Sequence, residues 1–214
     1  MRYVQQMYLF CYTTAMKLII GVDEAGRGAW AGPLVAAAVY LKTNKKFNHK
    51  LLRDSKKLSP LQREEVFDYL QDVVEIGLGI IDSQEIDRMG LQRANVSAVD
   101  KALENLSTTA GTGRDLSVQI DYIGAFEKYT KLKNNYTLHK FGESKFLEIA
   151  AASIIAKVTR DRMMIELAQR FSDYGFELHK GYGTALHLKQ LKRRGVTEIH
   201  RRSFKPVALS LRDL

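Results

Sequence analysis

Residues 17–33, KLIIGVDEAGRGAWAGP, join a short apolar run to two adjacent acids and a glycine-rich loop. The run at residues 17–22 is rich in isoleucine and is bounded by charge and glycine. This pattern is typical of a central strand that is buried on both faces. A second strand is predicted over residues 32–41. The two acids, Asp23 and Glu24, therefore stand at the end of a buried strand, directly before the loop.

Burying two adjacent carboxylates is unfavourable unless a cation accompanies them. An unpaired buried charge costs several kcal/mol, which a basic side chain or a metal ion normally offsets. The oxygens of Asp23 and Glu24 suit Mg²⁺ or Mn²⁺. The alternative is that the pair only caps a turn at the strand end, and for an isolated acid pair that alternative would usually be correct.

The glycines of the loop invite comparison with a dinucleotide-binding motif. Gly26 and Gly28 have the spacing that opens G-x-G-x-x-G, but Ala31 occupies the place of the third glycine. Gly32 and Pro33 then lead into a strand and not into a helix whose N-terminus would hold a pyrophosphate. The sequence disfavours a dinucleotide site.

Strands and helices alternate along the rest of the chain. Ser59 and Pro60 predict the N-cap and first position of a helix, whose apolar stripe comprises Val66, Phe67, Leu70, Val73 and Val74. Further strands are predicted at residues 76–81, 116–121 and 136–141. Further helices are predicted at residues 91–106, 147–171 and 184–194, with a surface loop at residues 107–113. On the helix at 147–171 one face carries Ala151, Ile154, Val158, Ile165 and Ala168. This order predicts an α/β fold with helices on the faces of a mixed β-sheet.

Composition narrows the class of partner. A chain of 214 residues suits one domain, and 45% apolar with 27% charged residues excludes a disordered or fibrous protein. The net charge of +9 attracts polyanions, so nucleic acid is the first partner to consider. Charge alone does not separate this partner from the alternative of a merely basic, soluble protein.

Cysteine usage and hydropathy indicate a cytoplasmic protein. Cys11 is the only cysteine, which excludes a disulfide within the chain and a cysteine zinc site. The apolar patch at residues 7–11 is too short for a signal peptide and lacks a cleavage site. No uninterrupted apolar run approaches the roughly 20 residues that cross a bilayer. We therefore expect a soluble protein.

Six blocks of the sequence resemble the ribonuclease HII family, in the order of that family. The first is DEAGRG at residues 23–28 with AGP at 31–33. The others are DSKKLS at 54–59, EID at 85–87, AAASIIAKV at 150–158 with RD at 160–161, HKGYGT at 179–184 and HRRSF at 200–204. The likeness covers residues 17–206. It implies a ribonuclease H-like fold, a mixed sheet flanked by helices with a helical C-terminal region.

The resemblance also implies an activity and a metal site. The activity is that of an endoribonuclease that hydrolyses the RNA strand of RNA–DNA hybrids and nicks 5′ of ribonucleotides embedded in duplex DNA, leaving 5′-phosphate and 3′-hydroxyl ends. Four carboxylates would bind two divalent ions, Mg²⁺ or Mn²⁺. By motif these are Asp23, Glu24, Asp121 at the end of its strand, and Glu143, the acid ten positions before Ser153.

Substrate contacts follow from the same resemblance. Gly26, Arg27 and Gly28 would read the ribose 2′-hydroxyl through their backbone, together with the hydroxyl of Tyr182. The alternative for Tyr182 is an aromatic plug under a loop. Phosphate contacts are expected from Ser55, Lys56, Lys57, Ser153 and Lys157, although lysine pairs are mostly just solvated.

Two positions depart from the family pattern. Glu143 stands where the family usually has aspartate, and Tyr122 stands where it usually has glycine. Glutamate at the fourth site is a feature of the sister group, ribonuclease HIII, but the loop at residues 26–28 is of the HII type and no additional N-terminal domain is expected. Asp161 is the other candidate for the fourth carboxylate. We expect it to pair with Arg160 or Arg162 and to be structural.

Other functions remain as alternatives at this point. One is a nucleic-acid-binding relative without catalysis, and another is a different two-metal nuclease or an integrase on the same fold. The basic clusters at residues 192–194 and 200–202 would be a second phosphate-binding surface or would keep the region soluble. No histidine has the spacing of a metal ligand. We expect a monomer with an N-terminal extension at 1–16, a catalytic domain at 17–206 and a tail at 207–214.

Overall fold

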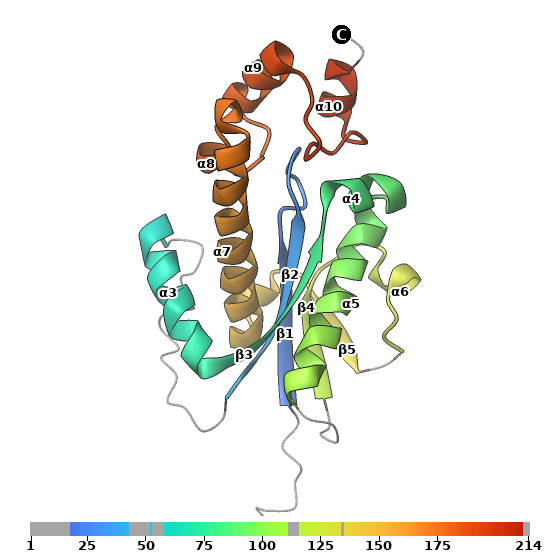
Figure 1. Cartoon of the computed structure of the whole chain (residues 1–214). Coiled ribbons are helices and arrows are strands. Elements are labelled where there is room, and N and C mark those ends of the chain that lie inside the picture. The colour runs from blue at the N-terminus through green and yellow to red at the C-terminus, as the bar shows by residue number, and fades with distance from the viewer. Residues whose placement is uncertain (1–17, 43–51, 53–57, 111–115, 134, 212–214) are drawn as a thin grey trace, which may run out of the picture.

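The computed structural model describes residues 18–42, 52, 58–110, 116–133 and 135–211. Five strands form one mixed sheet in the order β3-β2-β1-β4-β5 (Figure 1). The strands are β1 (Leu18–Ala25), β2 (Leu34–Leu41), β3 (Val74–Ile81), β4 (Leu116–Asp121) and β5 (Tyr136–His139). The pairs β1–β2 and β2–β3 are antiparallel, whereas β1–β4 and β4–β5 are parallel. The predicted α/β fold with a mixed sheet is confirmed.

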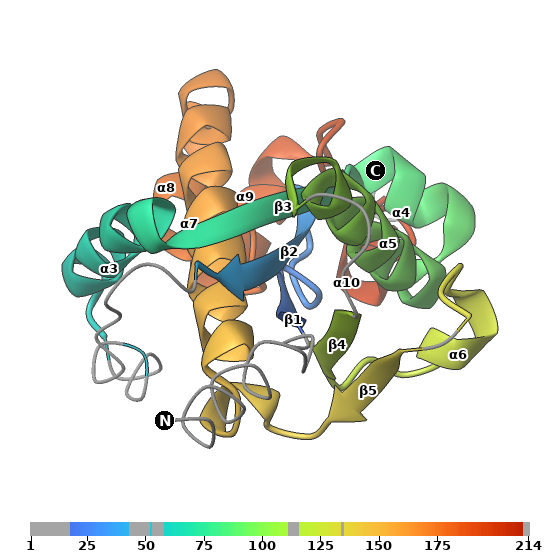
Figure 2. The same ribbon diagram turned by 90° about the horizontal axis from the view of Figure 1, so that it is seen from below.

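Helices cover both faces of this sheet (Figures 1 and 2). They are α3 (Pro60–Val73), α4 (Ser83–Met89), α5 (Leu91–Ala110), α6 (Phe126–Tyr129), α7 (Leu147–Arg170), α8 (Phe176–His179), α9 (Ala185–Arg194) and α10 (Lys205–Ser210), with 3₁₀ turns at Gly142–Ser144 and Ser172–Tyr174. The long helices α5 and α7 lie on opposite faces, and α3 lies beside α7. None of the helices in the described part of the chain is both long and apolar enough to span a bilayer.

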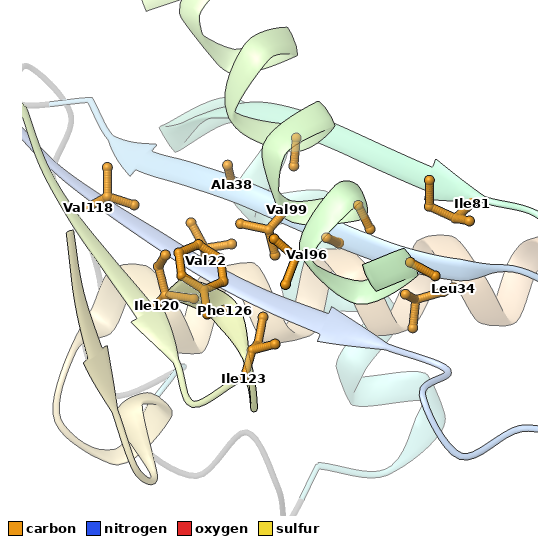
Figure 3. Close-up of a cluster of buried hydrophobic side chains, with 14 of the residues drawn as sticks. Val22, Leu34, Ala38, Ile81, Val96, Val99, Val118, Ile120, Ile123 and Phe126 are labelled. Atoms are coloured by element: carbon orange, nitrogen blue, oxygen red, sulfur yellow. The ribbon is translucent and has the colours of Figure 1, made fainter. Parts of the chain in front are cut away.

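Each face of the sheet has its own hydrophobic core. Figure 3 shows the core between the sheet and α5, where Val22 and Ile120 pack with Val96, Val99 and Phe126. The other core lies between the sheet and the helices α3 and α7. Fully burying a valine, isoleucine or phenylalanine stabilises a fold by about 1.5–3 kcal/mol. The sheet, held from both faces, is therefore a rigid platform for residues at its strand ends.

Helix α7 packs directly on β1 because Gly21 has no side chain. A Cβ at Gly21 would overlap the backbone of Glu148 and Ile149. This close approach brings the first turns of α7 against the strand that carries the two adjacent acids. The predicted cap of α3 is confirmed: Ser59 accepts from the N–H of Gln62 and forms a capping box with it.

Several boundaries differ from the sequence expectation. Strand β1 continues through Ala25, because β2 pairs with it as far as Ala25 and Val35, so the two acids lie within the strand. Val74 begins β3 and does not belong to the preceding helix. Residues 107–110 extend α5 and are not loop. A helix that has already formed extends at little further cost, and local polarity does not reveal its end.

The elements β5 and α7 are shorter than predicted, and part of α7 faces solvent. Strand β5 ends at His139, because Phe141 adopts a left-handed backbone conformation with φ of 58°. Helix α7 ends at Arg170. Ile165, expected on the buried face, is 44% exposed. This residue instead lines a surface pocket together with Leu178 and Tyr182.

The C-terminal helices gather at the end of the sheet where β1 turns into β2 (Figure 1). Asp87 on α4 anchors this region: its carboxylate accepts from the backbone N–H groups of Arg202 (2.7 Å) and Ser203 (2.9 Å). Val207 is fully buried on α10. The expected boundary between domain and tail at residue 206 thus falls inside a packed helix, and residues up to Ser210 fold with the domain.

Candidate active site

The adjacent acids Asp23 and Glu24 point to opposite faces of β1, as successive strand residues do. Asp23 faces α7, where the Ser153 hydroxyl hydrogen-bonds its carboxylate. Glu24 faces α5, where Asn95 Nδ2 donates to its Oε1 at 3.2 Å. Each carboxylate is therefore oriented by a polar side chain from a different helix. Ser153, expected at a phosphate, contacts Asp23 in this structure.

Burial and mutual repulsion favour the protonated forms of both acids. Desolvation, followed by the charge of Glu24, raises the pKa of Asp23 to about 8. Desolvation also raises the pKa of Glu24, against the hydrogen bond from Asn95 and the positive charge of Arg27. Carboxyl groups that hold protons this strongly are sites where a cation would replace the proton.

Asp121 joins these acids from the neighbouring strand. The parallel register pairs Val22 with Ile120, so Asp121 follows beside Asp23 at the carboxyl end of β4. Its negative charge raises the pKa of both Asp23 and Glu24. The backbone N–H of Gly142 donates to Asp121 Oδ1 at 2.8 Å. Glu143 follows Gly142 in the 3₁₀ turn, so its backbone lies next to Asp121.

The donor set fits a hard divalent cation in its chemistry. Asp23, Glu24 and Asp121 offer only oxygen ligands, which Mg²⁺ and Mn²⁺ prefer. In the described part of the chain, however, no group of three or more histidine, cysteine, aspartate or glutamate side chains converges closely enough to hold a metal ion.

Asn95 is a site residue that the sequence reasoning missed. Its side chain is 1% exposed, and its Oδ1 has no hydrogen-bond partner among the described residues, while its Nδ2 holds Glu24. An unsatisfied buried polar atom costs about 1–3 kcal/mol. The sequence did contain a clue to this residue: Asn95 is a polar residue within the apolar stripe formed by Ala94, Ala98 and Val99 on α5.

The glycine-rich segment at residues 26–33, here called the recognition loop, follows the two acids directly. Gly26 has φ of 93°, and a Cβ there would overlap the side chain of Arg160. Backbone hydrogen bonds join the loop to two distant segments: Trp30 N–H donates to Gly181 O at 2.8 Å, and Arg201 N–H donates to Trp30 O at 2.8 Å. Three of the sequence blocks thus form one unit.

Tyr182 lies within this unit and is half-buried. Its ring centroid is 5.5 Å from Lys157 Nζ and 5.1 Å from Arg160 Cζ, so two cations of α7 lie over the ring. A pocket of about 400 Å³ beside it is lined in part by Lys157, Lys180 and Arg63. Arg27 and Gly28 are exposed at the tip of the recognition loop. Tyr182 and the cations Arg63, Lys157 and Lys180 therefore line one pocket.

The expected partner of Asp161 is corrected by the structure. Lys157 Nζ lies 2.7 Å from Asp161 Oδ1, one helical turn away. Arg160 instead donates to backbone carbonyls, and Arg162 pairs with Glu64 on α3. Arginine was expected because it adjoins Asp161 in the sequence, but neighbours on a helix point in different directions. Ser55, Lys56 and Lys57 lie outside the described residues.

The basic cluster at residues 200–202 was expected on the surface, but most of it is buried. Arg201 is fully buried, and His200 is 1% exposed. Only Arg202 is exposed. A run of basic residues does not reveal which of them turn inward, because burial depends on the backbone carbonyls that the folded chain offers.

In this structure, two neighbouring parallel strands carry acids at their carboxyl ends, and helices cover both faces of the mixed sheet. This arrangement is that of the ribonuclease H-like nucleases. Comparison with known proteins identifies the branch. The chain belongs to the ribonuclease HII family, whose model matches residues 20–207. It is therefore a ribonuclease H enzyme, an endoribonuclease that acts on RNA–DNA hybrids.

Curated relatives and solved structures agree with this assignment. Ribonuclease HII of Fusobacterium nucleatum is 41% identical over 199 residues, which are 92% of this chain and 89% of the relative. That of Bacillus cereus is 43% identical over 193 residues, 90% of this chain and 70% of the relative. The RNase HII of Archaeoglobus fulgidus, solved in complex with PCNA, has a TM-score of 0.72 at 25% identity over 92% of this chain and all (100%) of that chain. Bst-RNase HIII, solved with Mn²⁺, has a TM-score of 0.78 at 20% identity over 96% of this chain and 72% of that chain, which shows a common fold.

Proposed function

We propose that this enzyme nicks duplex DNA on the 5′ side of embedded ribonucleotides, besides hydrolysing the RNA strand of hybrids. One observation carries the proposal: the carboxylates Asp23, Glu24 and Asp121, whose charges act on one another, adjoin a loop in which Arg27 and Gly28 are exposed. The carboxylates would bind the metal ions that hydrolyse the phosphodiester. A loop that approaches the sugar closely supplies discrimination of ribose from deoxyribose.

The cofactor in this proposal is Mg²⁺ or Mn²⁺, with two ions held by Asp23, Glu24, Asp121 and Glu143. Bound divalent ions would activate a water molecule and stabilise the leaving 3′ oxygen, which leaves 5′-phosphate ends. The residues of the chain orient the ligands. Ser153 holds the carboxylate of Asp23, Asn95 holds that of Glu24, and the Gly142 N–H holds that of Asp121.

Recognition of the 2′-hydroxyl is assigned to Gly26, Arg27, Gly28 and Tyr182. The left-handed conformation of Gly26 turns the chain sharply after β1, and glycine alone adopts it without strain. The loop thereby places Arg27 and Gly28 at the surface after Glu24. Burial raises the pKa of Glu24, and the charge of Arg27 partly opposes this rise. Tyr182 approaches from the loop between α8 and α9.

Phosphate contacts complete the proposal. Lys157 lies beside Tyr182 and lines the same pocket as Arg63 and Lys180. These three cations outnumber the two carboxylates of the pocket, Glu64 and Asp161, which favours contact with the phosphates of the strand next to the cut. Ser55, Lys56 and Lys57 keep the proposed phosphate role from the family motif. The proposal also includes a cytoplasmic monomer, with residues 1–16 as an extension outside the catalytic domain.

A substrate panel tests the proposed function. Purified protein would be incubated with an RNA–DNA hybrid, duplex DNA with one ribonucleotide, and all-DNA duplex, each with Mg²⁺, with Mn²⁺ and with excess EDTA. We expect cleavage of the first two substrates with either metal and none with EDTA. Equal cleavage of the all-DNA duplex, or full activity in EDTA, would contradict the proposal.

A further inference from the structure

Arg201 holds the recognition loop from the C-terminal segment. Its Nε and Nη2 donate to the carbonyl oxygen of Gly32 at 3.1 and 3.0 Å, and its Nη1 donates to the carbonyl oxygen of Arg27 at 3.1 Å. The side chain is 0% exposed. A planar guanidinium that contacts both ends of a loop restrains its shape, since its donors keep a fixed geometry.

Arg160 holds the same loop from helix α7. Its Nε donates to the carbonyl oxygen of Pro33 at 2.8 Å, and its Nη2 donates to that of Ala31 at 3.2 Å. This side chain is also 0% exposed. Together with Arg201, it holds four carbonyl groups of one short loop by side chains that are far away in the sequence.

Stability alone does not account for the two arginines. Among the ion pairs within the described residues, none includes Arg160 or Arg201. Burial lowers the pKa of Arg160, and burial with the charge of Arg160 lowers the pKa of Arg201 to about 9, which still leaves the group charged at neutral pH. A buried charge without an ionic partner costs several kcal/mol, whereas an apolar residue of similar volume would not.

Arg160 also connects the loop to Tyr182. The guanidinium carbon lies 5.1 Å from the ring centroid, within the range of a cation–π contact. The Nη1 atom of Arg160 is buried without a hydrogen-bond partner among the described residues. The Tyr182 ring is a favourable neighbour for the buried guanidinium charge. The Arg160 side chain therefore contacts both Tyr182 and the recognition loop, which it binds at Ala31 and Pro33.

We propose that Arg160 and Arg201 are positioning residues for ribonucleotide recognition, which hold the recognition loop and Tyr182 in one fixed arrangement. The proposal rests on the proposed function of that loop and of Tyr182. This role explains why the two charges are buried. A loop with glycine at residues 26, 28 and 32 is intrinsically flexible. Such a loop can recognise a single hydroxyl group only if its backbone is held within about 0.5 Å of the required position.

The test compares Arg160→Lys and Arg201→Lys with matched controls. Lysine keeps the charge but cannot hold two carbonyl groups in a plane. The controls make the same change nearby: Arg162→Lys on α7 and Arg202→Lys beside Arg201, both with exposed side chains. We expect kcat on duplex DNA with one ribonucleotide to fall about tenfold to a hundredfold in Arg160→Lys and Arg201→Lys, with little change in KM. In both control variants, kcat and KM should change little.

A double-mutant cycle adds a readout that a purely structural role would not change. If Arg160 acts through Tyr182, Arg160→Lys should lower kcat much less in a Tyr182→Ala background than in the wild type. Each variant is assayed well below its own melting temperature. Additive effects, unchanged kcat, or an equal loss in the control variants would overturn the proposal.

The remaining outcomes are also decisive. A lysine variant that does not fold at any temperature would assign the arginine to the fold and would overturn the positioning role. A wild-type protein that cuts hybrids without preferring the ribonucleotide junction would overturn the proposed recognition and, with it, this inference. A wild-type protein with that preference, whose lysine variants keep it at full rate, would overturn this inference alone.

Discussion

At the scale of residues, the pair Asp23 and Glu24 is divided between the two faces of β1. Asp23 is held by a serine of α7, and Glu24 is held by an asparagine of α5. A substitution in either helix would therefore change the orientation of one acid without touching the other. Asn95→Ala acts on Glu24 alone in this account, because its Nδ2 is bonded to that carboxylate.

The first prediction concerns the fourth carboxylate. Glu143 follows Gly142, whose N–H holds Asp121, whereas Asp161 is paired with Lys157 on α7. We expect Glu143→Gln to lower kcat by at least about a hundredfold with Mg²⁺ and Mn²⁺, because a charge at the metal site is lost. Asp161→Asn should cost under about 1 kcal/mol of stability, as partly exposed helical pairs do, and should leave kcat nearly unchanged.

Kinetics and thermal melting of both variants check this assignment. A folded Asp161→Asn protein without activity, together with an active Glu143→Gln protein, would exchange the two roles.

The sequence predicted the acids but not the residues that orient them. Asp23 and Glu24 are recognisable because they open the DEAGRG block that resembles the family. Asn95 and Arg201 are not, because their roles depend on contacts across 71 and 169 residues of chain. Arg201 looked solvated within its basic run, since nothing local shows that the Gly32 carbonyl lies within its reach.

At the scale of elements, His187 and His200 in the C-terminal region form a buried hydrogen-bonded pair, on which a third histidine stacks. His187 Nδ1 donates to the carbonyl of Tyr182 at 3.0 Å, and its Nε2 lies 3.0 Å from Nε2 of His200. His200 Nδ1 accepts from Thr197 N–H at 3.0 Å, so His200 Nε2 carries the proton that it donates to His187. Both rings are therefore neutral, with defined tautomers. His179 stacks on His187, with ring centroids 4.5 Å apart.

The second prediction follows from these neutral rings. Burial lowers the pKa of His187 to about 4 and, with the charge of His187, that of His200 to about 3. Unfolded histidine titrates near 6.5, so below that pH the unfolded chain binds more protons and stability is lost as the pH falls toward 4. The elevated pKa of Asp23 has the opposite effect, because the folded state then binds the extra proton.

A variant comparison separates the two contributions. His200→Gln should be less stable than the wild type at pH 7.5 and should lose less stability between pH 7 and pH 4.5, since one titrating ring is gone while Asp23 is common to both proteins. Denaturant titrations at several pH values measure the difference. Parallel profiles for the two proteins would mean that His200 has the same pKa in the folded and the unfolded chain, which would contradict this prediction.

Element boundaries show where sequence patterns reach their limit. The cap at Ser59 and the end of α9 at Gly195 follow from local chemistry and were predicted. The end of β5 was not, because the left-handed Phe141 is imposed by the turn that carries Gly142 to Asp121. Tertiary contacts override the preference of a residue at such positions.

At the scale of the whole molecule, the sheet carries the acids and the C-terminal region completes the recognition surface. The bridge between Ala31 and His200 joins the recognition loop to the segment that precedes α10. Blocks of sequence near both ends of the domain therefore meet at one site. The recognition loop is therefore complete only when the C-terminal region is folded against it.

The third prediction concerns the start of the chain. The family model begins at residue 20, and β1 begins at Leu18. Deleting residues 1–15 should shift the melting temperature by less than about 2 °C, which corresponds to less than about 1 kcal/mol, and should leave kcat on a hybrid unchanged. A substantial loss of either would place the extension in the working domain.

Mapping the cut in duplex DNA that contains a single ribonucleotide tests the central claim most directly. With Mg²⁺ or Mn²⁺, the account predicts one nick on the 5′ side of the ribonucleotide, with a 3′-hydroxyl on one fragment and a 5′-phosphate on the fragment that begins with the ribonucleotide. Replacing the ribose with its 2′-deoxy counterpart should abolish the nick. A cut elsewhere, or the same nick in the deoxy duplex, would contradict the account.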